Sequence, residues 1–181
     1  MAKTTTHLMT VAEYEQIPER NEGFYYELHH GELVKVCFPK ARHYKTQWRL
    51  RKLLEAPAGD AGIVDIEIAF RPLPEYEVWG ADVAFVSKER WERIDPDGYL
   101  LGSPELVIEI LSPSNTAEEM MDRERTCLEG GCREFWVVDE KRRQVKVTTP
   151  DGVTKTYREG QQIPLTLFGG GSLAVSAIFT E

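Results

Sequence analysis

Two acidic residues stand inside apolar runs of the sequence, where a charge is unexpected. Glu109 lies in the run VIEIL, and Asp82 lies in the run ADVAFV. The branched aliphatic neighbours predict that both carboxylates are largely buried. Because a buried, unpaired carboxylate is strongly destabilising, each acid needs a cation, a set of hydrogen-bond donors or a metal ion.

The spacing of the two runs allows the acids to meet. A single connection separates the runs, so their strands can be neighbours in a sheet. Two converging carboxylates suit a hard divalent cation, with Mg²⁺ or Mn²⁺ as the usual occupant. The alternative for each acid is an arginine partner or backbone N–H donors. Taken together, Asp82 and Glu109 favour a metal site, which requires neighbouring strands and carboxylates on one face of the sheet.

The chain before these acids predicts a helix, a hairpin and a second helix. Thr10 and Glu13 have the spacing of a capping box for a short helix in TVAEYEQI. The strand patterns FYYELH and ELVKVCF flank His30-Gly31, which predicts a β-hairpin. The stretch PKARHYKTQWRLRK has six lysines and arginines, no acid and a helical spacing of apolar residues. Its basic face is either solvated or turned toward phosphate.

The strand IVDIEIAF alternates apolar and polar residues. The alternation marks Asp65 and Glu67 as its solvated face. The same alternation places four apolar residues together on the other face: Val64, Ile66, Ile68 and Phe70.

The later segments predict a sheet with a covering helix. PELVIEILS and REFWVVD are almost continuously apolar, which is typical of strands covered on both faces. Between them, Thr116 and Glu119 predict the start of a helix that ends near Gly130-Gly131. QVKVTT and VTKTYRE form a further predicted hairpin, and the tail IPLTLFGGGSLAVSAIF predicts short strands or a strand with a glycine bend.

Length, charge and cysteine usage set limits on the class of protein. The 181 residues predict one domain over residues 1–181. A net charge of −8 argues against a protein wrapped in nucleic acid, although one face can still be basic. No apolar run approaches the roughly 18 residues of a membrane-spanning helix, so no membrane association is expected. Three cysteines without a C-x-x-C pair predict reduced thiols, and we expect a cytoplasmic protein with no signal peptide.

The order of these segments resembles the bacterial Uma family of restriction-endonuclease-like proteins, within the PD-(D/E)XK nuclease superfamily. The matching segments are YYELHHGELVKV, GADVAFV, PELVIEILSPSNTAEEMMDRERTCLEGGCREFWVVDE and the hairpins that follow. They cover most of the chain, and the segment from Pro104 to Asp139 is the most specific part.

The resemblance implies a restriction-endonuclease-like α/β fold, with a mixed central β-sheet flanked by helices and additional β-hairpins. It implies that Asp82 and Glu109 bind Mg²⁺ or Mn²⁺ and that the carbonyl of Ile110 is a further ligand. Such enzymes hydrolyse phosphodiester bonds, and their metal polarises the scissile phosphate and activates a water molecule. The expected partner is DNA, and a homodimer would supply two active sites.

The chain departs from the nuclease motif at three positions. Ala81 precedes the first acid where the motif has proline, and Leu111 stands where it has lysine. In the family the lysine sits on the following helix, where this chain has Arg123 between Glu119 and Cys127. Arginine keeps the charge and can bind phosphate, but it is not equivalent to a compact lysine beside the attacking water.

The main hypothesis is therefore a metal-dependent DNA endonuclease with Asp82, Glu109 and Arg123 as catalytic residues. The alternative is a catalytically silent nuclease-fold protein that acts as a nucleic-acid-binding or protein-interaction module. Two further acids are possible accessory residues. Glu27 either reaches the metal site or pairs with a lysine across its hairpin, and Glu119 either contributes to the site or forms a helix salt bridge with Arg123.

Four other residues are expected to serve packing rather than chemistry. Cys127 and Cys132 are expected to pack as small apolar side chains. Trp79 and Trp136 lie in strand segments and are expected in the core.

Overall fold

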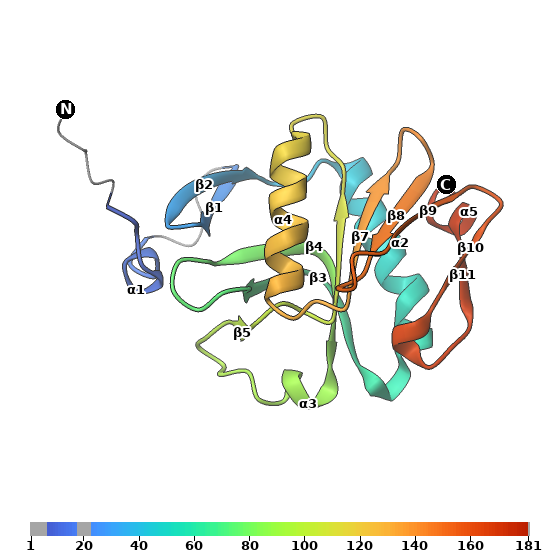
Figure 1. Cartoon of the computed structure of the whole chain (residues 1–181). Helices are drawn as coiled ribbons and strands as arrows, with labels where there is room; N and C mark the ends of the chain where they lie inside the picture. Colours follow the sequence, from blue (N-terminus) through green and yellow to red (C-terminus); the bar gives the residue numbers. More distant parts are fainter. Residues whose placement is uncertain (1–6, 18–22, 181) are drawn as a thin grey trace.

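The centre of the molecule is a seven-stranded sheet in the order β5-β3-β4-β6-β7-β8-β9. A computed structural model describes residues 7–17 and 23–180 (Figure 1). The strands of this sheet are β3 (Gly62–Arg71), β4 (Trp79–Ser87), β5 (Leu100–Leu101), β6 (Leu106–Ile110), β7 (Glu134–Asp139), β8 (Gln144–Thr148) and β9 (Thr154–Arg158).

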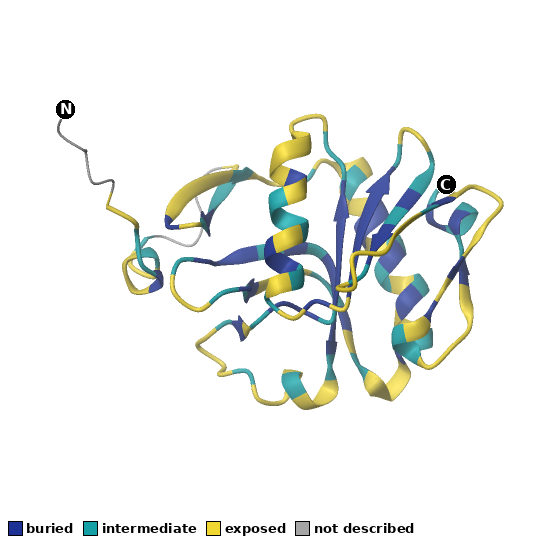
Figure 2. Ribbon diagram, viewed as in Figure 1, coloured by how far each residue is buried: buried dark blue, intermediate teal, exposed yellow. Residues whose placement is uncertain are grey.

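The sheet is mixed, as the sequence predicts. β6 and β7 are parallel and are joined by helix α4 (Ala117–Glu129), whereas β3, β4 and β6 pair antiparallel, as do β7, β8 and β9. β5 adds a short parallel pairing to β3 at the edge. Every residue of β6 and β7 is buried, which confirms the prediction that both faces are covered (Figure 2).

Two helices cover opposite faces of the sheet. Helix α2 (Ala41–Ala58) contributes Leu50 and Leu54 to one core cluster, which includes Ile108. Helix α4 contributes Met120 and Cys127 to a second cluster. Figure 1 shows α4 on one side of the central strands and α2 on the other. The apolar stripe of each helix is thus buried against the sheet, which stabilises both helices.

Helix α4 begins with the capping box that the sequence predicts. Thr116 accepts a hydrogen bond from the backbone N–H of Glu119, and the Glu119 carboxylate accepts one from the backbone N–H of Thr116. The reciprocal pair satisfies two donors that the first helical turn would leave without partners.

A β-hairpin and a short helix lie beside the start of strand β4. The hairpin consists of β1 (Phe24–His29) and β2 (Glu32–Cys37), as predicted, and its turn has positive φ at His30 (51°) and Gly31 (77°). The backbone of Leu28 exchanges two hydrogen bonds of 2.9 Å with Val78, just before β4, which docks the hairpin onto the sheet. Helix α1 (Val11–Tyr14) has the predicted capping box.

The remaining elements are short. The polar segment after β4 contains helix α3 (Lys88–Trp91) and β5, neither of which was predicted. The tail forms the two-stranded sheet β10 (Gln162–Pro164) and β11 (Ser172–Ala174), followed by helix α5 (Val175–Ile178), and 3₁₀ turns occupy Gly59–Ala61 and Thr166–Phe168. The predicted short strands are confirmed, and α5 is an addition. No described helix has the length and apolar content needed to cross a membrane.

Strand β3 bends at Glu67, which the simple alternation does not predict. Glu67 has φ +55°, and the antiparallel pairing with β4 is interrupted there, opposite Asp82. Apolar residues before the bend pack in the α2 cluster, and those after it, such as Ile68 and Phe70, pack in the α4 cluster. The prediction that all four apolar residues share one face is therefore wrong, because the bend turns the strand over.

Candidate active site

The candidate site lies where strands β4 and β6 separate. Their pairing ends at Val83 opposite Ile108, so Asp82 and Glu109 are the next residues on two neighbouring strands. Beyond this point the Asp82 side chain, rather than a backbone carbonyl of β4, bonds to β6: its Oδ2 accepts a hydrogen bond of 2.6 Å from the N–H of Ile110. The predicted neighbouring strands are confirmed.

Helix α2 supplies two partners for the other oxygen of Asp82. The Nε2 of His43 lies 2.8 Å from Asp82 Oδ1, and the Nε2 of Gln47 donates to the same oxygen at 2.9 Å. Burial alone would lower the pKa of His43, but the neighbouring carboxylates of Asp82, Glu140 and Glu67 outweigh burial and raise it. His43 and Gln47 were not predicted, although their four-residue spacing on a helix places them on one face.

Glu67 is exposed, as the alternation of its strand predicts, and its carboxylate also joins this cluster. Its Oε1 accepts a 2.5 Å hydrogen bond from Gln47 Nε2, and its Oε2 accepts one of 3.3 Å from the hydroxyl of Tyr25. Partial burial and the nearby Asp82 carboxylate raise the pKa of Glu67, despite these two donors. The positive φ of Glu67 is the local feature that turns it toward Asp82.

Glu109 faces Arg123 of helix α4. Arg123 Nε lies 2.9 Å from Glu109 Oε1, yet neither atom has a well-aligned hydrogen bond, so the contact is electrostatic. Burial raises the pKa of Glu109 to about 8, against the opposing effect of Arg123 and with the repulsion of Asp82. Arg123 also contacts a second acid, whose pKa is lowered instead.

That acid is Glu27 of the hairpin. Its Oε2 lies 3.2 Å from Arg123 NH1 and 2.6 Å from His29 Nε2, and its Oε1 accepts a 3.0 Å hydrogen bond from the N–H of Gly80. Burial alone would raise the pKa of Glu27, but Arg123, His29 and Gly80 together lower it. The predicted lysine partner across the hairpin is wrong, because the residue opposite Glu27 is Val34.

All three outer nitrogens of Arg123 are engaged by protein groups. Besides the two carboxylates, its NH2 donates to the carbonyl of Gly80, and its guanidinium lies 5.1 Å from the ring centre of Trp79. Its side chain is only 14% exposed, so these contacts do not support the direct binding of phosphate that we expected from the sequence. The predicted salt bridge to Glu119 is also wrong, because Glu119 caps the helix and is exposed.

The partners of the two central acids come from opposite faces of the sheet. Asp82 is bound by α2 and Glu109 by α4, so the prediction that both carboxylates share one face of the sheet is wrong. Among the described residues no three histidine, cysteine or acidic side chains are gathered tightly enough to hold a metal ion. Ile110 contacts Asp82 through its N–H, and the role of its carbonyl stays a prediction.

The residues at the gap nevertheless fit a hard divalent cation by their chemistry. The Oε1 atoms of Glu109 and Gln47 are buried and have no hydrogen-bond partner. Both are hard oxygen donors beside Asp82, the type that Mg²⁺ and Mn²⁺ prefer. Burial destabilises the ionised form of Glu109, and Arg123 offsets this destabilisation only in part. A bound cation would stabilise the ionised carboxylate.

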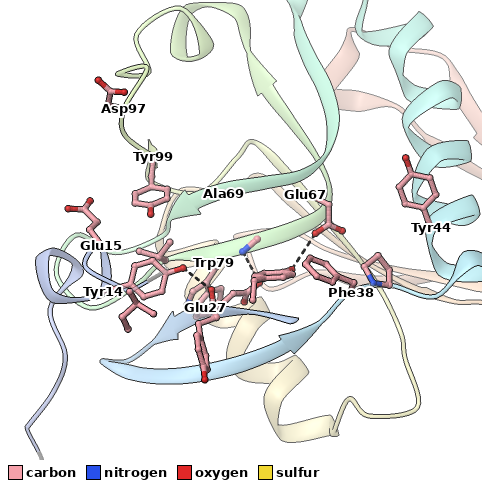
Figure 3. Close-up of a pocket in the computed structure, with 16 residues that line it drawn as sticks. Tyr14, Glu15, Glu27, Phe38, Tyr44, Glu67, Ala69, Trp79, Asp97 and Tyr99 are labelled. Atoms are coloured by element: carbon pink, nitrogen blue, oxygen red, sulfur yellow. Dashed lines mark hydrogen bonds between the residues drawn. The ribbon is translucent and has the colours of Figure 1, made fainter. Parts of the chain in front are cut away.

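A pocket of about 830 Å³ adjoins this cluster (Figure 3). It is lined by Glu27, Glu67 and Gly80 of the site and by residues of the hairpin and of helices α1 and α2. The volume lies within the range of about 300–1,000 Å³ that is common for binding pockets. The pocket thus reaches Glu27 and Glu67 of the cluster, whereas Asp82 and Glu109 do not line it.

The fold and the acid-rich gap between two central strands define a restriction-endonuclease-like nuclease fold. The chain belongs to the Uma2 family, described as "Putative restriction endonuclease", which matches residues 11–176. The chain is similar in structure to "a putative nuclease belonging to DUF820 from Anabaena variabilis ATCC 29413". The identity is 20%, the match covers 94% of this chain and 97% of that chain, and the TM-score is 0.81. This likeness confirms the predicted fold. The search of curated proteins found no match.

Proposed function

We propose that the protein is a Mg²⁺- or Mn²⁺-dependent endonuclease that hydrolyses phosphodiester bonds of DNA. The observation that carries the proposal is that Asp82 and Glu109 are the next residues on β4 and β6 where the pairing of these strands ends, with two buried oxygens that lack a hydrogen-bond partner, those of Glu109 and Gln47. Family membership supports a nuclease, and enzymes with this type of fold generally use divalent metal ions.

Asp82, Glu109 and the carbonyl of Ile110 are the groups that would hold the cation, with the amide oxygen of Gln47 close by. A bound divalent cation polarises the scissile phosphate and lowers the pKa of a water molecule. His43 and Gln47 orient Asp82 through its Oδ1, and the N–H of Ile110 fixes its Oδ2. This support from two elements holds the carboxylate in one rotamer before substrate arrives.

Arg123 is a positioning residue in this proposal. It links Glu109 of β6 to Glu27 of the hairpin and places a permanent positive charge beside the acids. That charge lowers the repulsion a phosphate would meet at a site with four carboxylates, because Coulomb interactions are strong away from bulk water. Arg123 thereby replaces part of the electrostatic function of the lysine that the family carries.

We infer that the enzyme is a single domain over residues 1–181 and that it acts on DNA in the cytoplasm. A homodimer would allow cleavage of both strands of a duplex, because each subunit carries one cluster.

The test is nicking of supercoiled plasmid DNA with Mg²⁺ or Mn²⁺ and without metal. The parent should convert the plasmid to open circles only with metal, and Asp82→Asn and Glu109→Gln should abolish conversion. Asp65→Asn is the matched control, because Asp65 is an acid of β3 that pairs with Arg51 outside the cluster. A parent that leaves the plasmid intact in both metals would favour the silent nuclease-fold alternative.

A further inference from the structure

The pocket beside the cluster has an unusual wall of aromatic rings. Besides Trp79 of β4, they come from helix α1, the hairpin and the residue after it, the start of helix α2 and the segment before β5, and they are Tyr14, Tyr25, Tyr26, Phe38, Tyr44 and Tyr99 (Figure 3). Flat rings beside a hydrolytic site can hold a flat ligand by stacking.

Two of these rings are largely exposed. Phe38 is 41% exposed and Tyr44 is 48% exposed, at the end of the pocket nearest α2. The ring of Phe38 lies 5.7 Å from that of Tyr25, so the exposed rings continue into the pocket. Tyr25 in turn donates to Glu67 of the cluster. A ligand stacked on Phe38 would therefore lie beside Tyr25, which connects the pocket to Glu67 of the cluster.

The charge of the pocket selects against phosphate. Its described lining has four acids, Glu15, Glu27, Glu67 and Asp97, and neither lysine nor arginine. Phosphate groups would be repelled, whereas a neutral nucleobase would not. Carboxylates also accept hydrogen bonds from the exocyclic amino groups of bases.

Positive charge lies outside the pocket lining, on three residues next in sequence to Phe38 and Tyr44, which we call the basic rim. Lys40, Arg42 and Lys45 are exposed at the start of α2, next to Phe38 and Tyr44. In the described part of the chain none of these three forms an ion pair with an acid, unlike Arg51 and Lys52 further along the helix. Cations beside exposed rings are the arrangement with which proteins hold single-stranded nucleic acid, with phosphates on the cations and bases on the rings.

We propose that this aromatic pocket binds an unpaired nucleobase of the substrate. The preferred DNA of the proposed nuclease then has a single-stranded segment or an unstacked nucleotide next to the cleaved bond. The proposal rests on the proposed nuclease function for the identity of its ligand. It follows from the exposed rings, the acidic wall and the basic rim, because a paired base inside a duplex cannot stack on a side chain.

The experiment measures binding without cleavage, with EDTA present and a short fluorescent oligonucleotide as the probe. Anisotropy is compared for the single strand and for the same sequence as a blunt duplex. The parent should bind the single strand more tightly. Base stacking on one ring corresponds to roughly 5- to 150-fold in affinity, so Phe38→Ala and Tyr44→Ala should each weaken single-strand binding by about fivefold or more.

Trp91→Ala is the matched control. Trp91 is a 39% exposed aromatic residue of α3 that does not line the pocket, so its loss should leave the affinity unchanged. Thermal melting checks that each variant is folded. Equal affinity for single strand and duplex, or unchanged single-strand binding in both ring variants, would overturn the proposal.

Cleavage assays separate this proposal from the nuclease function itself. Metal-dependent nicking by a parent whose ring variants bind single strands normally would leave the nuclease function standing and remove the base-binding pocket. Ring-dependent single-strand binding by a protein that cuts no DNA would support the pocket and remove the nuclease function.

Discussion

Replacing Arg123 should cost most of the stability that the electrostatics of the site contribute. Arg123, Glu27 and Glu109 have side chains that are 14%, 6% and 10% exposed. Burial raises the pKa of Glu109, whereas Arg123, His29 and Gly80 together lower that of Glu27, so Glu27 is the acid that Arg123 helps to keep ionised. Arg123→Met leaves Glu27 buried with His29 and one backbone N–H. Removing one partner of a buried pair costs about 3–5 kcal/mol in the free energy of unfolding.

The assay is thermal unfolding followed by circular dichroism at neutral pH. For a domain of this size, 1 kcal/mol shifts the melting temperature by roughly 2–4 °C, so Arg123→Met should melt about 6–20 °C below the parent. Arg125→Met is the matched control on the same helix, because Arg125 is 66% exposed and, within the described part of the chain, forms an ion pair with Asp122 alone. Its melting temperature should change by no more than about 2–4 °C.

A double variant and a pH series test the cause. Glu27→Gln together with Arg123→Met should be more stable than Arg123→Met alone, because no buried charge is left without a partner. The Glu27 contribution to parent stability is present above its unfolded pKa, near 4.5, and is lost as pH falls through the lowered folded pKa. The gap between parent and Arg123→Met should therefore narrow below about pH 4.5. A gap that is under 1 kcal/mol at neutral pH, or that ignores pH, refutes this reasoning.

Three other predictions concern metal, pH and packing. Mg²⁺ or Mn²⁺ at 100 times its dissociation constant should stabilise the parent by about 2.7 kcal/mol, which raises its melting temperature by roughly 5–11 °C. Asp82→Asn and Glu109→Gln should show no such rise, and equal melting shifts in all three proteins would argue against the metal site. His30 lies between the carboxylates of Glu77 (2.8 Å) and Asp122 (2.6 Å). Burial alone would lower the pKa of His30, but these two acids outweigh burial and raise it. The contribution of His30 to stability is therefore full below about pH 6.5 and is lost as pH rises through the raised pKa. The advantage of the parent over His30→Asn, which tolerates the positive φ of this turn, should accordingly shrink above pH 6.5 in melting curves, and a constant advantage contradicts the assignment. Gly130→Ala should lower stability by about 1–3 kcal/mol in urea denaturation, since an added Cβ would lie 2.6 Å from the carbonyl oxygen of Pro72.

The sequence alone determined the elements whose signals are local. The capping boxes at Thr10 and Thr116 fix helix starts through hydrogen bonds that span three residues. The turn His30-Gly31 and the continuous apolar runs of β6 and β7 likewise gave the hairpin and the covered strands. Asp82 and Glu109 were also visible, because a charged residue in an apolar strand needs a partner.

The partners of those acids follow only from how the distant segments pack together. His43 and Gln47 belong to a helix nearly 40 residues before Asp82, and nothing in their own segment distinguishes them from other polar helix residues. Glu67 is a solvent-exposed strand residue, as predicted, but the bend at its positive φ also lets it share the Gln47 amide with Asp82.

The pairing of Glu27 with Arg123 joins residues 96 apart in the chain. It exists because the backbone of Leu28 docks the hairpin onto Val78 while helix α4 crosses between β6 and β7. Sequence periodicity records which side of an element is buried. It does not record which distant element covers that side, since docking depends on the sum of many contacts and on strand register, and those contacts exist only once the chain has folded.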